Sequence, residues 1–311
     1  MQWAGNRAVT PGAQCVRFMK DGQDQVSPFA GGADFAAASP SLARAAEALV
    51  RAGGGPGLSW EGSTLTSHFQ PIYCVRRQSC LGFEALARAR DAAGNAIAAD
   101  DFFARNHNGR RGLLDWACRA LHLRNYAMVD PGDRTLFINV HPEAAVRDVR
   151  RGRDFAELVG YYGLSPKRVC IEILEHPCSD EDLLREAVQG YRAVGASIAM
   201  DDFGAASSNF DRVVALRPDV VKIDKSILAR AVGAEKASRI LPAMIELLHE
   251  FGVRVAVEGI ESGAGAAAAL EARADYLQGF YFAPPAPVLA DEVRGRELLD
   301  RLLHTPILAA A

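Results

Sequence analysis

The sequence predicts an α/β barrel preceded by a short extension, and three observations support this fold. The chain has 311 residues, which fits one barrel domain of roughly 250 residues with an added segment. From His68 onward, strand-like and helix-like stretches alternate, a pattern typical of parallel strands joined by crossover helices. Polar residues stand at or near the ends of the predicted strands, where such barrels place their active sites.

The predicted elements after residue 60 are eight strands and seven helices. Apolar runs predict strands at 68–75, 81–88, 135–140, 168–174, 197–202, 219–224, 253–258 and 275–282. Helical patterns occur at 111–128, 153–162, 180–194, 207–216, 235–251 and 264–273, with a last one near 289–303. Eight strands are enough to close a barrel.

The connection between the first two strands departs from the regular pattern. It runs only from Arg76 to Ser79, which is too short to hold a crossover helix. These two strands are therefore predicted to be antiparallel neighbours.

Residues 1–60 are expected to form an N-terminal extension, and residues 61–305 the barrel domain. The extension has few large aliphatic residues before Leu42, so it is not expected to fold alone. A capped amphipathic pattern follows Ser39-Pro40-Ser41 and stops at Gly53, which predicts one short helix. We expect this helix to pack on the barrel or on a second subunit. A dedicated sensor function is the less favoured alternative.

Composition and charge predict a soluble, cytoplasmic protein. The formal net charge of −3 does not suggest a nucleic-acid polymer as a partner. The six cysteines include no Cys-x-x-Cys pair, and several lie in apolar runs, which is typical of reduced, buried thiols. No stretch approaches the roughly 20 apolar residues that a spanning helix needs, so no membrane association is expected.

The stretch from Ser197 to Gly204 is an apolar run that ends on Asp201, Asp202 and Phe203. A buried strand here would carry two adjacent carboxylates to the edge of the core, and the glycine would let the chain turn away. Neighbouring carboxylates repel each other unless a positive charge lies between them, which favours a divalent cation. The alternative is a solvated Asp-Asp turn.

The other predicted strands also end on polar residues. Together with the two aspartates, these residues are Glu84, Asn139, Glu172, Lys222, Glu258 and Gln278. The carboxyl ends of barrel strands converge on one mouth, so these side chains are expected to lie together. Repulsion and desolvation in such a cluster would be costly without bound cations.

Oxygen donors without histidine or cysteine favour a hard cation such as Mg²⁺ or Mn²⁺ over zinc. Two metals that share a carboxylate are used for displacement at phosphorus. The sequence contains no glycine-rich phosphate loop, because the glycines between Gly53 and Gly57 do not follow a strand and no Lys-Ser or Lys-Thr follows them.

The motifs together resemble the EAL domain family. They are Gln70-Pro71-Ile72, Phe83-Glu84-Ala85-Leu86 with Arg88, Ile138-Asn139-Val140, Glu172-Ile173-Leu174-Glu175, Asp201-Asp202-Phe203-Gly204, Val221-Lys222-Ile223-Asp224, Val257-Glu258-Gly259-Ile260-Glu261 and Gln278-Gly279-Phe280. The resemblance extends from about Ser67 to about Leu303. It implies a modified (β/α)8, TIM-like barrel with one antiparallel strand, and a phosphodiesterase that opens cyclic di-GMP to linear pGpG.

The resemblance also implies roles for individual residues. Two divalent cations, Mg²⁺ or Mn²⁺, are expected. The ligands of the first would be Glu84, Asn139, Glu172 and Asp201, and those of the second Asp201, Asp202 and Glu258. Lys222 would orient the attacking water, and Glu258 is a candidate general base or a ligand only. The residues expected to contact or line the substrate site are Gln70, Arg88, Asp202 and Gln278. Glu175 would brace the loop after Asp202, and Glu261 would be a supporting acid.

The sequence departs from the family pattern at three places. Leu174 stands where threonine is common, and Pro284 where a basic residue is frequent. The loop 205–209 reads Ala-Ala-Ser-Ser-Asn instead of the usual Thr-Gly-Tyr-Ser-Ser. Because this loop also contributes to the family's dimer interface, its shape and the coupling of subunits in the expected homodimer are open. Two interpretations therefore remain: an active metal-dependent phosphodiesterase, which we favour, or a degenerate module that binds cyclic di-GMP or a protein partner without hydrolysis.

Overall fold

The structure is a computed structural model that describes residues 42–52, 55–106, 111–130, 132–147, 152–205, 210–233, 239–290 and 292–304. The strands are β1 (Leu58–Trp60), β2 (Ser63–Cys74), β3 (Ser79–Arg90), β4 (Ala96–Ile97), β5 (Thr135–Val140), β6 (Val169–Ile173), β7 (Ser197–Phe203), β8 (Val220–Ile223), β9 (Arg254–Val257) and β10 (Tyr276–Leu277). The helices are α1 (Leu42–Ala52), α2 (Ala99–Arg105), α3 (Arg111–Val129), α4 (Pro142–Arg147), α5 (Gly152–Tyr161), α6 (Glu181–Ala193), α7 (Phe210–Leu216), α8 (Lys225–Gly233), α9 (Ile240–Glu250), α10 (Gly263–Glu271) and α11 (Glu292–His304), with a 3₁₀ turn at Pro166–Arg168.

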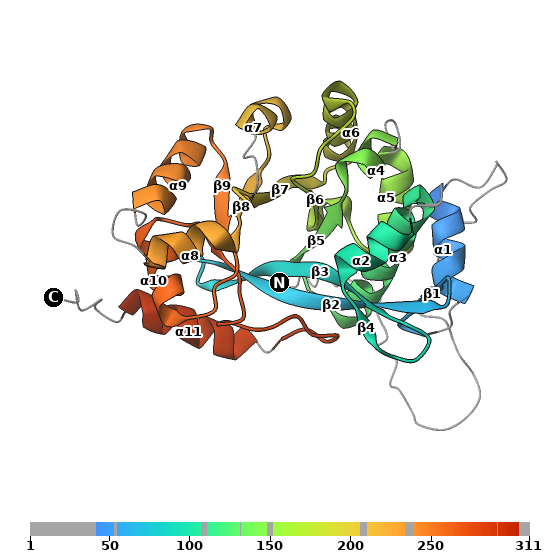
Figure 1. Ribbon diagram of the computed structural model, residues 1–311, viewed down its shortest axis with the longest axis horizontal. Coiled ribbons are helices and arrows are strands. Elements are labelled where there is room, and N and C mark those ends of the chain that lie inside the picture. Colours follow the sequence, from blue (N-terminus) through green and yellow to red (C-terminus); the bar gives the residue numbers. More distant parts are fainter. Residues whose placement is uncertain are drawn as a thin grey trace, which may run out of the picture.

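The strands form a closed barrel, which confirms the predicted fold class. From β2 the pairing runs through β10, β9, β8, β7, β6, β5 and β3, and β3 pairs again with β2. Strand β2 is antiparallel to both β3 and β10, and the other barrel pairs are parallel. The short connection between β2 and β3 therefore produces the expected antiparallel strand. Helices surround the strands in Figure 1, and none of those described is long and apolar enough to cross a bilayer.

Two layers of side chains fill the barrel. The lower layer consists of Ile72, Cys74, Phe137, Cys170, Ala199, Val220, Ala256 and Tyr276. Side chains two positions apart on a strand share a face. The residues two positions after members of this layer are Asn139, Glu172, Asp201, Lys222, Glu258 and Gln278. The upper layer is therefore polar, and it lies toward the carboxyl ends of the parallel strands.

Helix α1 packs against the outside of the barrel domain. Ala46 and Val50 are fully buried in the same hydrophobic cluster as residues of α3 and the barrel strands. The Arg124 guanidinium on α3 donates a hydrogen bond from Nη1 to the Val50 carbonyl oxygen at 2.7 Å. The stretch that follows Ser41 thus belongs to the packed body of the protein.

The last predicted strand is shorter than expected. Strand β10 covers only Tyr276–Leu277, whereas the sequence suggested 275–282. The Gly279 backbone lies against Ile260, where a Cβ would clash with the Ile260 carbonyl oxygen. The Tyr281 amide then donates to that carbonyl at 2.9 Å, which turns the chain away from the sheet. Helices α2, α4 and α8 and strands β1 and β4 were not predicted from the sequence.

A buried histidine joins α3 to strand β2. The His122 Nδ1 atom lies 2.8 Å from the Ser67 hydroxyl, and the Asn125 side chain donates to the same hydroxyl at 3.1 Å. Burial is the main cause that lowers the pKa of His122 from 6.5 to about 4, and the Arg88 charge adds to it against the opposing effect of Glu84. The fold therefore favours the neutral imidazole.

The sign of the resulting pH dependence follows from this lowered pKa. The contribution of His122 to the free energy of unfolding is constant above pH 6.5, falls as pH decreases from 6.5 to about 4, and is constant below that. The loss over this interval is on the order of 3 kcal/mol. Urea unfolding of the wild type and of His122→Gln measures it. The variant should lose less stability between these pH values, and equal losses would contradict the assignment.

Candidate metal centre

Strand β7 carries two consecutive carboxylates to the same mouth of the barrel. A regular strand would point Asp201 and Asp202 to opposite faces. The pairing with β8 shifts between Met200 and Phe203, so both aspartates lie opposite Lys222. Asp202 has a φ of 55°, in the left-handed region. This local bulge lets oxygens of both carboxylates approach Glu258, because one ligand atom from each of the three lies within 4.8 Å of the others.

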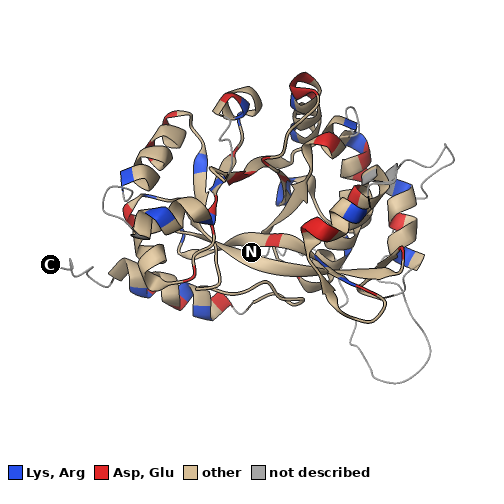
Figure 2. Ribbon diagram, in the orientation of Figure 1, with Lys and Arg blue, Asp and Glu red and all other residues tan. Residues whose placement is uncertain are grey.

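Lys222 lies at the centre of the acidic cluster. Its Nζ atom is 2.8 Å from Glu172 Oε1, 3.0 Å from both Glu84 Oε2 and Asp201 Oδ1, and 2.5 Å from Glu258 Oε1. The lysine and Glu172 are almost fully buried. These residues come from β3, β6, β7 and β8 and from the end of β9, and Figure 2 shows acidic stretches on β3 and β7 at the middle of the molecule.

Glu84 is held by a set of side-chain amides. Asn139 Nδ2 donates to Glu84 Oε1 at 2.8 Å, and Gln278 Nε2 donates to Glu84 Oε2 at 2.7 Å. Gln278 also lies 3.3 Å from Gln70 Oε1, and Gln70 donates to the Ala283 carbonyl oxygen at 3.2 Å. Burial alone would raise the pKa of Glu84, but Lys222 and these amide donors outweigh it and lower the pKa. Glu84 is therefore the acid most strongly held in its ionised form.

The remaining acids of the cluster resist ionisation. Burial, followed by the charges of neighbouring carboxylates, raises the pKa values of Glu172, Asp201 and Glu258 despite the attraction of Lys222. The half-buried Asp202 has its pKa raised to about 6 by burial and by Asp201. A single ammonium group thus does not supply enough positive charge for the cluster.

The donor set fits two divalent cations. The acids form two groups, Glu84 with Glu172 and Asp201, and Asp201 with Asp202 and Glu258. With all five carboxylates and Lys222 charged, the cluster has a formal charge of −4, which two divalent cations would balance. Two buried oxygens at this mouth, Asn139 Oδ1 and Glu172 Oε2, accept no hydrogen bond from the described residues. Such oxygens are suited to a hard cation.

Three other predicted site residues lie outside this cluster. The partly buried Arg88 follows Glu84 on β3, and its Nη1 atom donates to the Ala87 carbonyl oxygen at 3.0 Å. Glu175 follows β6 and is partly buried. Glu261 is exposed, immediately before the N-cap residue of α10. The loop 206–209, where the sequence departs from the family pattern, is outside the described residues.

Two histidines at this mouth were not predicted from the sequence. His141 follows β5 and His176 follows β6 closely, and their ring centroids are 4.9 Å apart. No metal-ligand spacing marks these histidines in the sequence. Their only signal is that each stands just after a strand that carries a polar residue of the cluster.

Comparison with known proteins identifies an EAL domain over most of the chain. The model of the EAL domain family matches residues 58–285. YkuI of Bacillus subtilis, an EAL-domain containing protein, is 26% identical over 242 residues, which cover 76% of this chain and 58% of YkuI. PdeB of Escherichia coli, a probable cyclic di-GMP phosphodiesterase, is 24% identical over 236 residues, which cover 73% of this chain and 44% of PdeB. The chain spans about a fifth to somewhat over half of the length of the curated relatives it matches.

Solved structures agree in fold. A standalone EAL protein from Vibrio cholerae, in its cyclic di-GMP-bound form, superposes with a TM-score of 0.67 at 25% identity, covering 75% of this chain and 97% of that one. The complex of Bacillus subtilis YkuI with cyclic di-GMP and calcium gives a TM-score of 0.66 at 24% identity, covering 77% of this chain and 60% of that one.

Proposed function

This chain belongs to the EAL domain family, and on that premise we propose that it hydrolyses cyclic di-GMP to linear pGpG. The observation that carries the proposal is the intact polar layer at the carboxyl-terminal mouth: four carboxylates surround the buried Lys222, and two buried oxygens beside them have no described hydrogen-bond donor. A module that only binds has no need of so costly a cluster.

We assign the cation ligands from the two acidic groups. Glu84, Asn139, Glu172 and Asp201 would hold one cation, and Asp201, Asp202 and Glu258 the other. Mg²⁺ or Mn²⁺ bound there would lower the pKa of a water and neutralise charge at phosphorus. Asp201 is the carboxylate that both sites would share.

The chain's own residues then orient the reaction. The Lys222 ammonium contacts an oxygen of each of four carboxylates, so it fixes their positions. With cations bound to some of these oxygens, one of its three N–H groups would be released to donate a hydrogen bond to the attacking water. Glu258, at the end of β9, is either a ligand or the group that accepts the proton of that water. Arg88 would pair with a substrate phosphate, and Gln70, Asp202 and Gln278 would line the substrate site.

Metal dependence is the first test. Because all proposed ligands are oxygen donors, Mg²⁺ or Mn²⁺ should support hydrolysis and EDTA should abolish it. Ca²⁺ should inhibit, since its larger radius and looser coordination would misplace the attacking water. Chromatography of the nucleotide products with each ion measures the effect. Full activity in EDTA would exclude the two-cation mechanism.

The alternative function is a receptor that binds cyclic di-GMP without cleavage. The observation that favours it is the sequence of the loop 205–209, which follows Asp202 and contains alanine at position 206 instead of the family's usual glycine. Position 206 is outside the described residues. A displacement of about 1 Å at Asp202 could reduce the rate a hundredfold.

Restoring the loop separates the two functions. Ala206→Gly, alone or with Ala205→Thr, should raise the turnover rate more than it changes substrate affinity, because Gln70 and Arg88 lie on other strands and Gln278 directly follows β10. Turnover assays and equilibrium binding on the same preparations measure the two quantities. A wild type that binds cyclic di-GMP but forms no pGpG with either metal, together with a restored variant that gains activity, would establish the receptor function. We also propose that the chain is cytoplasmic and that it forms a homodimer through the barrel. Sedimentation analysis would test whether it is a dimer.

A further inference from the structure

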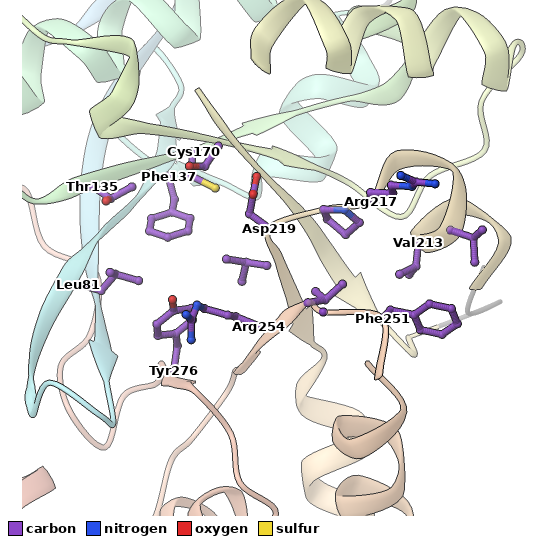
Figure 3. Close-up of a pocket in the computed structure, with 16 residues that line it drawn as sticks. Leu81, Thr135, Phe137, Cys170, Val213, Arg217, Asp219, Phe251, Arg254 and Tyr276 are labelled. Atoms are coloured by element: carbon purple, nitrogen blue, oxygen red, sulfur yellow. The ribbon is translucent and has the colours of Figure 1, made fainter. Parts of the chain in front are cut away.

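A cavity of about 660 Å³ opens at the amino-terminal mouth of the barrel, opposite the acidic cluster. Its walls include the first residues of several strands, among them Thr135 of β5, Ser197 of β7 and Arg254 of β9. In Figure 3, Phe137 and Cys170 lie above Tyr276 and Arg254, and Phe251 lies farther to the right. The cavity is thus separate from the proposed metal centre.

The floor of this cavity is the lower interior layer of the barrel. Phe137, Cys170, Val220 and Tyr276 belong both to that layer and to the cavity lining, and all four are buried. Bulky branched residues normally fill the layers of such a barrel. Here four of the eight positions of the lower layer hold cysteine or alanine, and one of these, Cys170, lines the cavity. The volume lies within the range of roughly 300–1,000 Å³ typical of small-molecule sites.

The outer wall of the cavity is apolar and exposed. Val214 on α7 is 54% exposed, and Phe251 after α9 is 49% exposed. Both line the cavity, so an apolar body that entered it would cover these side chains and remove their surface from water. The floor and the outer wall together would contact such a body on two sides.

The rim of the cavity has an excess of positive charge. Asp219 Oδ2 accepts a hydrogen bond from the Ile198 amide at 2.8 Å and lies 3.9 Å from Arg192. Arg254 pairs with Asp275 at 3.4 Å. No carboxylate of the described residues lies within ion-pair distance of the Arg217 guanidinium. An anionic group at the rim would therefore find a guanidinium available.

We propose that this cavity binds an amphipathic organic anion, a small molecule with an aromatic or aliphatic body and one carboxylate, phosphate or sulfonate group. The body would lie between Tyr276, Phe137 and the outer wall, and its anionic group would contact Arg217. The floor is the layer directly beneath Asn139, Glu172, Lys222 and Gln278. The occupant would therefore contact side chains that support the proposed metal centre, although the inference does not depend on the proposed hydrolysis.

The test is a fluorescence titration of the full chain with 8-anilinonaphthalene-1-sulfonate at neutral pH. The neutral analogue N-phenyl-1-naphthylamine serves as the control ligand, because it has the same aromatic body without the sulfonate. We expect one saturable site for the sulfonate and weaker binding of the neutral analogue. Loss of one charge-assisted contact should weaken sulfonate binding by about fivefold or more in Arg217→Asn, with little change for the neutral analogue.

The control variant is matched in backbone conformation. Arg217 and Arg273 are both exposed and have positive φ, 46° and 65°. Asparagine tolerates this conformation, so neither Arg217→Asn nor Arg273→Asn should perturb the fold. Arg273 does not line the cavity, and its variant should bind as the wild type does.

Val214→Glu, at an exposed position of the wall, should also weaken binding. Equal affinities of the two asparagine variants for the sulfonate, or no saturable binding by the wild type, would overturn the proposal.

Discussion

Replacing Glu84 with alanine is expected to lower the turnover rate by about a hundredfold or more while leaving the protein folded. The carboxylate lies 3.0 Å from Lys222 and is oriented by Asn139 and Gln278, so its removal takes away a proposed cation ligand and the acceptor that positions two amides. The fold should survive, because Glu84 also repels its neighbours: its charge raises the pKa values of Glu172 and Glu258.

Steady-state kinetics and thermal unfolding would measure the two effects of Glu84→Ala separately. We expect the loss in kcat, with KM changed much less, because Arg88 and Gln70 remain. Glu271→Ala, at an exposed glutamate in the last turn of α10, is the control and should behave as the wild type does. A Glu84→Ala protein with near wild-type turnover would show that the metal centre is misplaced.

Replacing Lys222 with methionine is expected to destabilise the metal-free protein by about 3–5 kcal/mol at neutral pH. Its Nζ atom is within 3.0 Å of four carboxylates in the barrel interior, and methionine keeps the length of the side chain without its charge. The acids would then have no positive partner in the cluster. Part of the loss should disappear as pH falls and the carboxylates become protonated.

Added Mg²⁺ or Mn²⁺ should restore more stability to Lys222→Met than to the wild type, because the cations would become the only positive charges of the cluster. Denaturant unfolding with EDTA and with each cation measures this difference. Lys225→Met, three residues along and exposed, is the control and should show no such dependence. Equal metal-induced stabilisation of the wild type and Lys222→Met would contradict the assignment of the cluster as a cation site.

The barrel could be predicted from the sequence because its signals are local. A polar residue follows the apolar run of each strand. Because side chains alternate between the two faces of a strand, Asn139, Glu172 and Lys222 fall on the interior face. The length of the connection after Arg76 also indicated the antiparallel strand. These features depend only on neighbours along the chain.

Other features depend on contacts between distant segments, which the sequence does not display. The end of β10 is set by the approach of Gly279 to Ile260. The pairing shift at Asp202 depends on the register of β7 against β8. The amino-terminal cavity is lined by residues of several strands, of α7 and of the segment after α9, so no single stretch of sequence indicates it.

The most direct test of the proposed activity is to incubate the purified chain with excess cyclic di-GMP and Mn²⁺, and to quantify both nucleotides over time. The proposed mechanism predicts that pGpG accumulates to many times the protein concentration, and that Glu84→Ala forms almost none. Binding of cyclic di-GMP without formation of pGpG, with either Mg²⁺ or Mn²⁺, would contradict it.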